Sequence, residues 1–392
     1  MEENKEMYLV YSNDYWLDVV GRSKGDDSGA VNDAPARALS ADDKKEMFIR
    51  SFFANNSFRH SALLTGSGSS VVCGGKIREG LWESCKESIQ RISKIIKGHE
   101  SYVASKDIES FLSHAVQYAT ITKKASLGKA IAKLKREIRQ ACDLKLEGCA
   151  HEEVIKKMTA RKATLPRAEI FTTNYDTLFE QAATRSGIIV IDGFSFSQPR
   201  TFSGRYFDYD IVDREMTRTK SEENYVPNVI HLHKLHGSLD WVLEGNSVVQ
   251  RNLRAEEEPL IIYPSRDKYA ESYDQPYFEM MARFQAFLRK KDCLLMVAGY
   301  GFADKHINSA IIDAVRQNPS FHLFVVDYGI EVEVDTNRKA HVINMNLYRS
   351  LFTDIGNNMT IVRETFDGFA RSMPLNKAYR IDEHSDMPNI RV

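Results

Sequence analysis

An amide and a carboxylate stand two residues apart, at Asn174 and Asp176, shortly after residues 169–172, which predict the end of a buried strand. The residues that follow, 177–183 (TLFEQAA), are typical of the start of a helix. In alternating α/β chains, ligands bind at the carboxyl ends of strands. An amide and a carboxylate placed there could orient a sugar hydroxyl or a water molecule. Taken alone, such a segment is more often an ordinary strand–turn–helix in which Asp or Thr caps the helix.

A loop of small residues at 66–70 (GSGSS) forms a second group of candidates, after a short apolar run at 62–64. Glycines let backbone N–H groups close around a phosphate, and the hydroxyls could add donors. Ser70 replaces the third glycine of a dinucleotide fingerprint, and no strand ending in an acid follows at the usual spacing, which argues against an ordinary Rossmann dehydrogenase. The candidate phosphate-binding residues here are Thr65, Gly66, Ser67, Gly68 and Ser69.

His236 is a third candidate, because it lies where an alternating strand pattern in 228–243 opens into a loop at a glycine. His231 and His233 precede it at a spacing that could hold a metal ion. No acidic or cysteine partner is at hand, so we interpret these two histidines as polar packing on a strand. His236 differs from them through its position at the strand end.

The last third of the chain adds two more strand ends. Residues 293–315 predict a buried strand, a glycine turn and a helix that Asp304 is placed to cap. The turn, Gly299, Tyr300 and Gly301, is a second place where backbone could approach a phosphate. Residues 321–329 predict another buried strand that ends in Asp327, a carboxylate suited to the two hydroxyls of a ribose.

The composition is that of an ordinary globular protein. The 392 residues are 43% hydrophobic and carry a net charge of −1, so we expect no general attraction to nucleic acid or acidic membranes. No apolar run reaches the ~18–20 residues of a membrane helix, and the acidic N-terminus lacks a secretory segment, so we expect a cytoplasmic protein. The five cysteines include no CxxC pair, which argues against disulfides and a zinc site.

The order of apolar patterns predicts an α/β fold, a Rossmann-like parallel sheet flanked by helices, with an all-α helical insertion. We expect an arm and helix at 1–58, a catalytic domain at 59–330 and a helical extension at 331–392. The charged helical middle would interrupt the catalytic domain at about 76–165. Residues 194–227 have the aromatic and polar composition of an irregular lid or specificity segment.

In this order, the strand ends resemble motifs of the sirtuin (Sir2-like) family. TGSGSS (65–70) is similar to its GAGxS loop, and TTNYD (172–176) to its TQNxD motif. HGS (236–238) is similar to the catalytic His-Gly, and AGYGF (298–302) to the phosphate-binding GTS segment. VVD (325–327) falls where that family has a residue near the adenine ribose.

The chain also departs from the sirtuin deacylases. Those enzymes carry a four-cysteine zinc ribbon on which their peptide groove depends, and this sequence has no CxxC. GYG replaces GTS, so contacts there would come from backbone more than from a hydroxyl. The motifs TTNYD, KLHGS and GYGFxDxHIN resemble those of bacterial antiphage Sir2-like proteins more than those of the deacylases. In size the chain resembles the Sir2 subunit that works with a HerA-type hexameric ATPase.

The resemblance implies an NAD⁺ glycohydrolase that needs no metal, forms a homo-oligomer and is gated by a partner ATPase. His236 would act as general base, and Asn174 would position the water or a ribose hydroxyl. Asp176 would bind the nicotinamide side or hold the loop, with Thr173 beside them contacting NAD⁺. Two alternatives remain open: an NAD-dependent protein deacylase or ADP-ribosyltransferase, and a catalytically weak scaffold that binds NAD⁺ or ADP-ribose.

Overall fold

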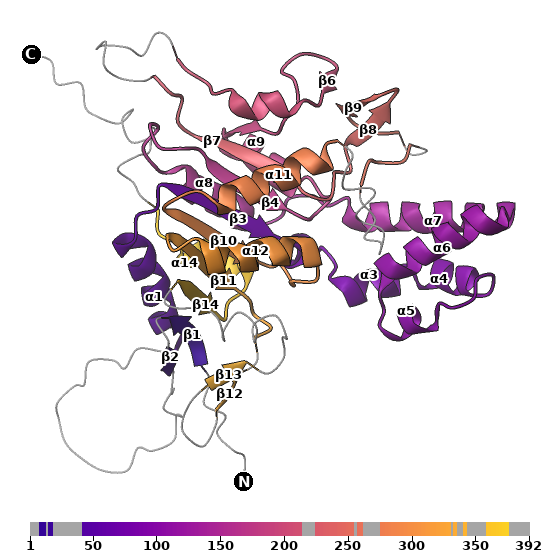
Figure 1. Ribbon diagram of the computed structural model, residues 1–392, viewed down its shortest axis with the longest axis horizontal. Coiled ribbons are helices and arrows are strands. Elements are labelled where there is room, and N and C mark those ends of the chain that lie inside the picture. The colour runs from indigo at the N-terminus through magenta and orange to yellow at the C-terminus, as the bar shows by residue number, and fades with distance from the viewer. Residues whose placement is uncertain are drawn as a thin grey trace, which may run out of the picture.

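A nine-stranded sheet forms the centre of the computed structural model (Figure 1), which describes residues 8–12, 15–18, 41–213, 224–254, 257–261, 275–330, 332–334, 340–342 and 358–375. The strand order is β2-β1-β14-β11-β10-β3-β4-β7-β5, and the seven strands from β14 to β5 are parallel. Helices flank this sheet, which confirms the α/β Rossmann-like fold. The parallel strands are β3 (His60–Thr65), β4 (Ala168–Thr172), β5 (Ile189–Ile191), β7 (Val229–Lys234), β10 (Cys293–Ala298), β11 (Phe321–Val326) and β14 (Met359–Val362).

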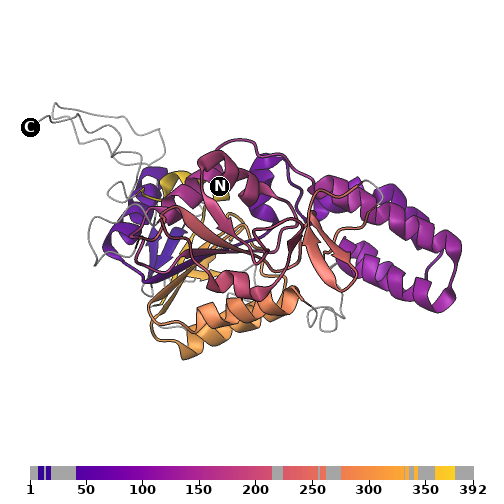
Figure 2. The ribbon, with the colours of Figure 1, turned by 90° about the horizontal axis from the view of Figure 1, so that it is seen from above.

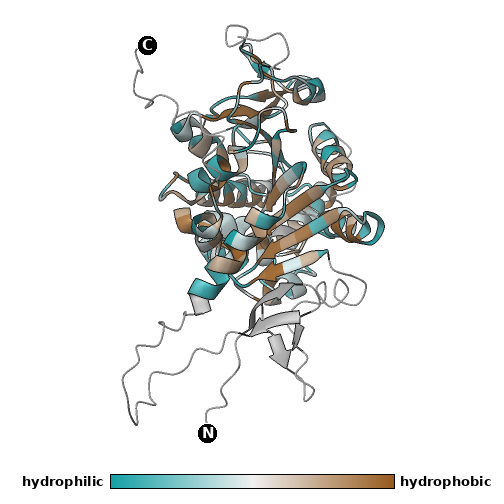
Figure 3. Ribbon diagram, turned by 90° about the vertical axis from the view of Figure 1, so that its left-hand side faces the viewer, coloured by the Kyte–Doolittle hydropathy of each residue, from teal (hydrophilic) through white to brown (hydrophobic). Residues whose placement is uncertain are grey.

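Both faces of the sheet are covered, which is why its strands are continuous apolar runs. All six residues of β10 are buried. Leu294 and Met296 face one core, called the first core below, and Leu295 and Val297 face the second core on the other side of the sheet. Figure 2 shows the helices in two layers, and Figure 3 shows the apolar strands between them. One layer holds α1 (Ala41–Asn55), α8 (Ala150–Thr159), α9 (Leu178–Ser186) and α14 (Phe366–Ser372); the other holds α11 (Tyr277–Leu288) and α12 (Lys305–Gln317).

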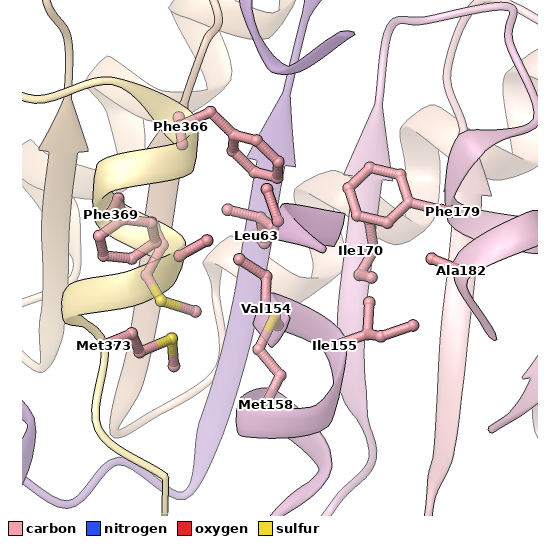
Figure 4. Close-up of a cluster of buried hydrophobic side chains, with 14 of the residues drawn as sticks. Leu63, Val154, Ile155, Met158, Ile170, Phe179, Ala182, Phe366, Phe369 and Met373 are labelled. Atoms are coloured by element: carbon pink, nitrogen blue, oxygen red, sulfur yellow. The ribbon is translucent and has the colours of Figure 1, made fainter. Parts of the chain in front are cut away.

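The C-terminal part contributes to the sheet, whereas the sequence predicted helices there. β14 has four buried residues and pairs with β11 in parallel, while α14 places Phe366 and Phe369 in the first core (Figure 4). This core also contains Leu63 from β3 and Val154 from α8. A separate pair of strands, β12 (Val332–Val334) and β13 (Ala340–Val342), lies between β11 and β14 in the sequence.

The N-terminal strand completes one edge of the sheet. β1 (Tyr8–Ser12) runs antiparallel to β14, with Val10 opposite Val362, and β2 (Tyr15–Asp18) pairs with β1. Of the arm and helix predicted at 1–58, residues 1–7, 13–14 and 19–40 lie outside the described residues.

Six helices occupy the stretch where the all-α insertion was predicted: α8 packs against the sheet, and the other five project to one side of it in Figure 1. These five helices form a core of their own around Trp82, Phe111 and Leu134. Asp107 caps α6, with its carboxylate accepting from the Ser110 backbone. The helices are α3 (Arg78–Ser84), α4 (Lys86–Ser93), α5 (Glu100–Ala104), α6 (Ile108–Thr122) and α7 (Ala125–Cys142).

The predicted lid segment, residues 194–227, forms the short helix η2 (Gly204–Asp208) and contributes β6 to a small antiparallel sheet, β6-β9-β8. Its strands are β6 (Arg200–Thr201), β8 (Trp241–Glu244) and β9 (Ser247–Gln250). Of the predicted lid, residues 214–223 lie outside the described residues. Across the part of the chain that the structure describes, no helix is long and apolar enough to cross a membrane.

His151 makes the first core sensitive to acid. It is 1% exposed, and its ring lies 5.0 Å from that of Phe179 and 4.9 Å from that of Phe366. Burial lowers the pKa of His151 from 6.5 to about 4, so the folded protein keeps this ring neutral. Between pH 6.5 and about pH 4, the unfolded chain therefore binds a proton at His151 that the folded chain does not bind.

We therefore predict that the free energy of unfolding falls as the pH drops from 6.5 towards 4. His151 alone accounts for about 2 kcal/mol of this loss at pH 4.5. A His151→Leu variant should lose correspondingly less stability between pH 7 and pH 4.5 in urea unfolding. Equal losses in the variant and the wild type would contradict this assignment.

Candidate functional site

The predicted site residues follow the carboxyl ends of five consecutive strands of the sheet, β11-β10-β3-β4-β7. The register aligns the strand ends, because Thr65 is opposite both Ala298 and Thr172, and Thr172 is opposite Lys234. The loops that leave these strands are therefore neighbours along one edge. This is the position where open α/β sheets bind ligands.

Asn174 is fixed by hydrogen bonds to the glycine loop. Its Nδ2 donates to the Gly66 carbonyl at 2.9 Å and to the hydroxyls of Ser70 at 2.8 Å and Ser69 at 3.2 Å. Ser69 donates its own proton to Gly66 O, and Ser70 donates to Asp176. Both hydroxyl oxygens must therefore accept from Asn174, which fixes Nδ2 towards the loop and Oδ1 away from it.

Asp176 joins the same loop to α9. The side chain is buried; its Oδ2 accepts from the Ser70 hydroxyl at 2.6 Å, and its Oδ1 accepts from the Leu178 backbone at 3.1 Å. These contacts hold the loop, one of the two roles considered for this residue. The predicted binding residues do not include Ser70, although it links Asn174 to Asp176. Its only sequence signal is its place in a run of small hydroxyl residues.

The two glycine loops contact each other directly. Gly68 N donates to Gly299 O at 2.8 Å, and a Cβ on Gly68 would lie 2.7 Å from Gly299 Cα. Gly299 has φ +67, and a Cβ there would lie 2.4 Å from Ser69 N. The sequence predicted that these backbones approach a phosphate, whereas here Gly68 and Gly299 are needed for the approach of one loop to the other.

The remaining predicted residues of these loops divide into buried and accessible positions. The Thr65 hydroxyl donates to that of Thr172 at 2.9 Å, and Thr173 N donates to Thr65 O at 3.0 Å, so both threonines tie β3 to β4. The Tyr300 hydroxyl is directed at Asn308 on α12, with 3.3 Å between the oxygens. The accessible positions are Ser67 and Gly301.

Asp327 follows β11, as predicted, and its carboxylate contacts the backbone of the turn that comes next. Its Oδ1 accepts from the Gly329 backbone at 2.8 Å, which shapes the turn after the strand. The residue is partly exposed at the same edge of the sheet as the glycine loops.

His236 is oriented by Asp304. The two side chains meet through His236 Nε2 and Asp304 Oδ2 at 3.1 Å, and both are mostly buried. Asp304 Oδ1 also accepts from the backbone of His306 at 2.9 Å, which confirms the predicted helix cap. The sequence could not reveal the pairing with His236, because 68 residues separate the two.

A groove of about 1040 Å³ begins at His236 and Asp304 and runs between α11 and α12. Tyr277, Phe278 and Ile307 line it near that end, and both apolar and charged side chains line the rest. A molecule lying in this groove would reach the His236–Asp304 pair from the side of these two helices.

His231 and His233 do not join the site. The His233 ring stacks between Phe171 at 4.5 Å and Phe207 at 4.4 Å, and its Nε2 lies 3.3 Å from Glu169. Burial alone would raise the pKa of Glu169, but the neighbouring His233 ring and the hydrogen-bonded Lys290 ammonium lower it to about 2. This confirms polar packing on the strand. Within the described ranges, no group of three His, Cys, Asp or Glu residues could hold a metal ion.

Residues 168–346 match the family model of the SIR2-like domain. This part of the chain is therefore similar to SIR2-like domains. The match supports a Sir2-like family and implies that the SIR2-like domain uses NAD⁺. Asn174, His236, Gly299 and Asp327 fall within it, whereas the loop at 66–70 precedes it in sequence and reaches the same edge through β3. No curated protein matches the chain.

We predict that Ser70→Ala destabilises the site locally. The substitution removes the donor to a buried oxygen of Asp176 and an acceptor for Asn174, which should cost about 1–3 kcal/mol in the free energy of unfolding. Ser67→Ala is the matched control, because Ser67 is exposed in the same helical turn and should change stability by less than about 0.5 kcal/mol. Equal effects of both substitutions on urea unfolding would contradict the proposed link.

Proposed function

We propose that the SIR2-like domain is an NAD⁺ glycohydrolase, which cleaves NAD⁺ to ADP-ribose and nicotinamide. The observation that carries this proposal is the placement of Asn174 and His236. They follow the adjacent strands β4 and β7, and each side chain is held in one orientation by its own partners. Sites with such pre-positioned groups lower the cost of bringing reactants into alignment.

The chemistry of the bond explains the two roles. Breaking the nicotinamide–ribose bond develops positive charge at the ribose C1′, and water must then attack that carbon. Asp304 accepts from Nε2 of His236, so the neutral ring carries its proton there and Nδ1 is the nitrogen that can accept a proton. His236 Nδ1 would take a proton from the attacking water or from a ribose hydroxyl. Asn174 Oδ1 would orient the same water or hydroxyl.

Water is the proposed nucleophile because the chain lacks the cysteine pairs of a zinc ribbon. In the sirtuin deacylases that ribbon supports the peptide groove. An unregulated NAD⁺ hydrolase would deplete its own cell. We therefore place the protein as the effector of an antiphage defence system, a cytoplasmic homo-oligomer gated by assembly with a HerA-type ATPase, on the basis of the sequence resemblance.

One observation favours a second candidate function. The groove between α11 and α12 begins at His236 and Asp304 and is large enough for part of a peptide. An acceptor in this groove would replace water, and the reaction would then be deacylation or ADP-ribosyl transfer.

Nicotinamide release from NAD⁺ by the purified protein tests these functions. The assay is run alone, with a HerA-type ATPase, and with an acetylated peptide. Release without peptide supports the hydrolase, and release only with peptide supports the second candidate. If no condition releases nicotinamide, the hydrolase proposal is wrong, and calorimetric binding of NAD⁺ would then indicate a binding scaffold.

We predict that Asn174→Ala and His236→Ala each lower kcat for nicotinamide release by about 10²- to 10⁴-fold, because each removes a group that aligns or deprotonates a reactant. His114→Ala is the matched control: this histidine lies on α6, where it contacts the Lys97 carbonyl, and its loss should leave kcat unchanged. Full turnover in either site variant would refute the assignment.

A pair of substitutions at Asp304 separates its two contacts. Asn can still cap α12, but it cannot supply the negative charge beside His236. We predict that Asp304→Asn keeps the stability within about 0.5 kcal/mol and lowers kcat by at least about 10-fold. Asp304→Ala should lose about 1 kcal/mol more, because the cap is also removed. Urea unfolding and nicotinamide release measure the two effects, and an unchanged kcat in Asp304→Asn would exclude a role for this carboxylate in catalysis.

A further inference from the structure

Lys234 is a buried cation at the end of β7, two residues before His236. It is 2% exposed, and its ammonium lies beneath the turn that carries Asn174 and Asp176. A buried ammonium must have acceptors for its three N–H groups. The acceptors of the Lys234 ammonium therefore indicate which part of the structure this charge holds in place.

All three contacts of Nζ go to the segment that follows β4. The ammonium donates to the backbone carbonyl of Tyr175 at 3.4 Å, to that of Asp176, and to Glu180 Oε1 at 2.9 Å. Two of the three acceptors thus belong to the turn itself, and the third lies on α9. Burial disfavours the charge, but the carboxylates of Glu180, Asp240 and Asp176 outweigh it and raise the pKa of Lys234.

We propose that Lys234 is a positioning residue that fixes the place of the Asn174–Asp176 turn relative to His236. The same side of the turn is also tied to the loop after His236, since Leu239 N donates to Tyr175 O at 3.0 Å. One lysine thereby couples the strand that ends at His236 to the turn that presents Asn174. The inference rests on the proposed NAD⁺ hydrolysis for its kinetic consequence.

The competing explanation is that Lys234 only neutralises Glu180, as a structural ion pair would. Lys234→Met alone cannot separate the two roles, because it leaves Glu180 without its cation and destabilises the fold. Lys234→Met/Glu180→Gln removes both charges and keeps side chains of similar size. Glu180→Gln alone leaves Lys234 in contact with both carbonyls of the turn.

We expect kcat to fall about 100-fold in the double variant with KM for NAD⁺ changed less than about 3-fold, because a shift of about 1 Å in a catalytic group has this size of effect. Glu180→Gln should stay within about 3-fold of the wild-type kcat. Lys290→Met is the matched control: Lys290 pairs with the mostly buried Glu169 at 2.8 Å on another part of the sheet, and its loss should leave kcat unchanged.

Hydrogen–deuterium exchange gives a readout that does not depend on activity. The amides of residues 172–181 should exchange faster in the double variant than in the wild type and Glu180→Gln. Wild-type kcat and protection in the double variant would overturn the inference, since Lys234 would then only neutralise Glu180. If the wild type itself releases no nicotinamide, the proposed function fails, and the exchange comparison alone decides the role of Lys234.

Discussion

The site depends on one steric constraint, the direct contact of two backbones at Gly68 and Gly299. No side chain fits at either position, because a Cβ would lie within 2.7 Å of the other loop. This contact sets where the first glycine loop ends and therefore where Ser70 can reach Asn174 and Asp176. The orientation of the candidate catalytic amide thus follows from the absence of side chains on two loops, which are supplied by adjacent strands far apart in sequence.

The central fold could be predicted from the sequence because its parallel strands are buried on both faces and appear as continuous apolar runs. β10 and β11 are such runs, each followed by a glycine turn or an acidic residue. β14 is not predicted from the sequence, because MTIV is only four residues long, although Thr, Ile and Val all favour strands. Its strand conformation depends on pairing with β11 and on α14 covering it, which local sequence does not encode.

The site was predictable to the same extent. Each candidate residue was found because it follows a strand, and parallel strands bring their carboxyl ends to one edge. The partners that orient those residues were not predictable, because Asp304 pairs with His236 and Lys234 with the Asn174–Asp176 turn only after folding. Such contacts join residues tens of positions apart, and no local spacing or periodicity marks them. The sequence therefore indicates which groups are present, and the fold determines their orientation.

One edge of the main sheet is built from both ends of the described chain, since Val10 in β1 lies opposite Val362 in β14. During translation, β1 leaves the ribosome long before the strand that must receive it. Until residue 362 has emerged, the outer edge of β11 lacks its parallel neighbour, and an unpaired strand edge invites association with other chains. Completion of this sheet therefore waits until residue 362 has been synthesised.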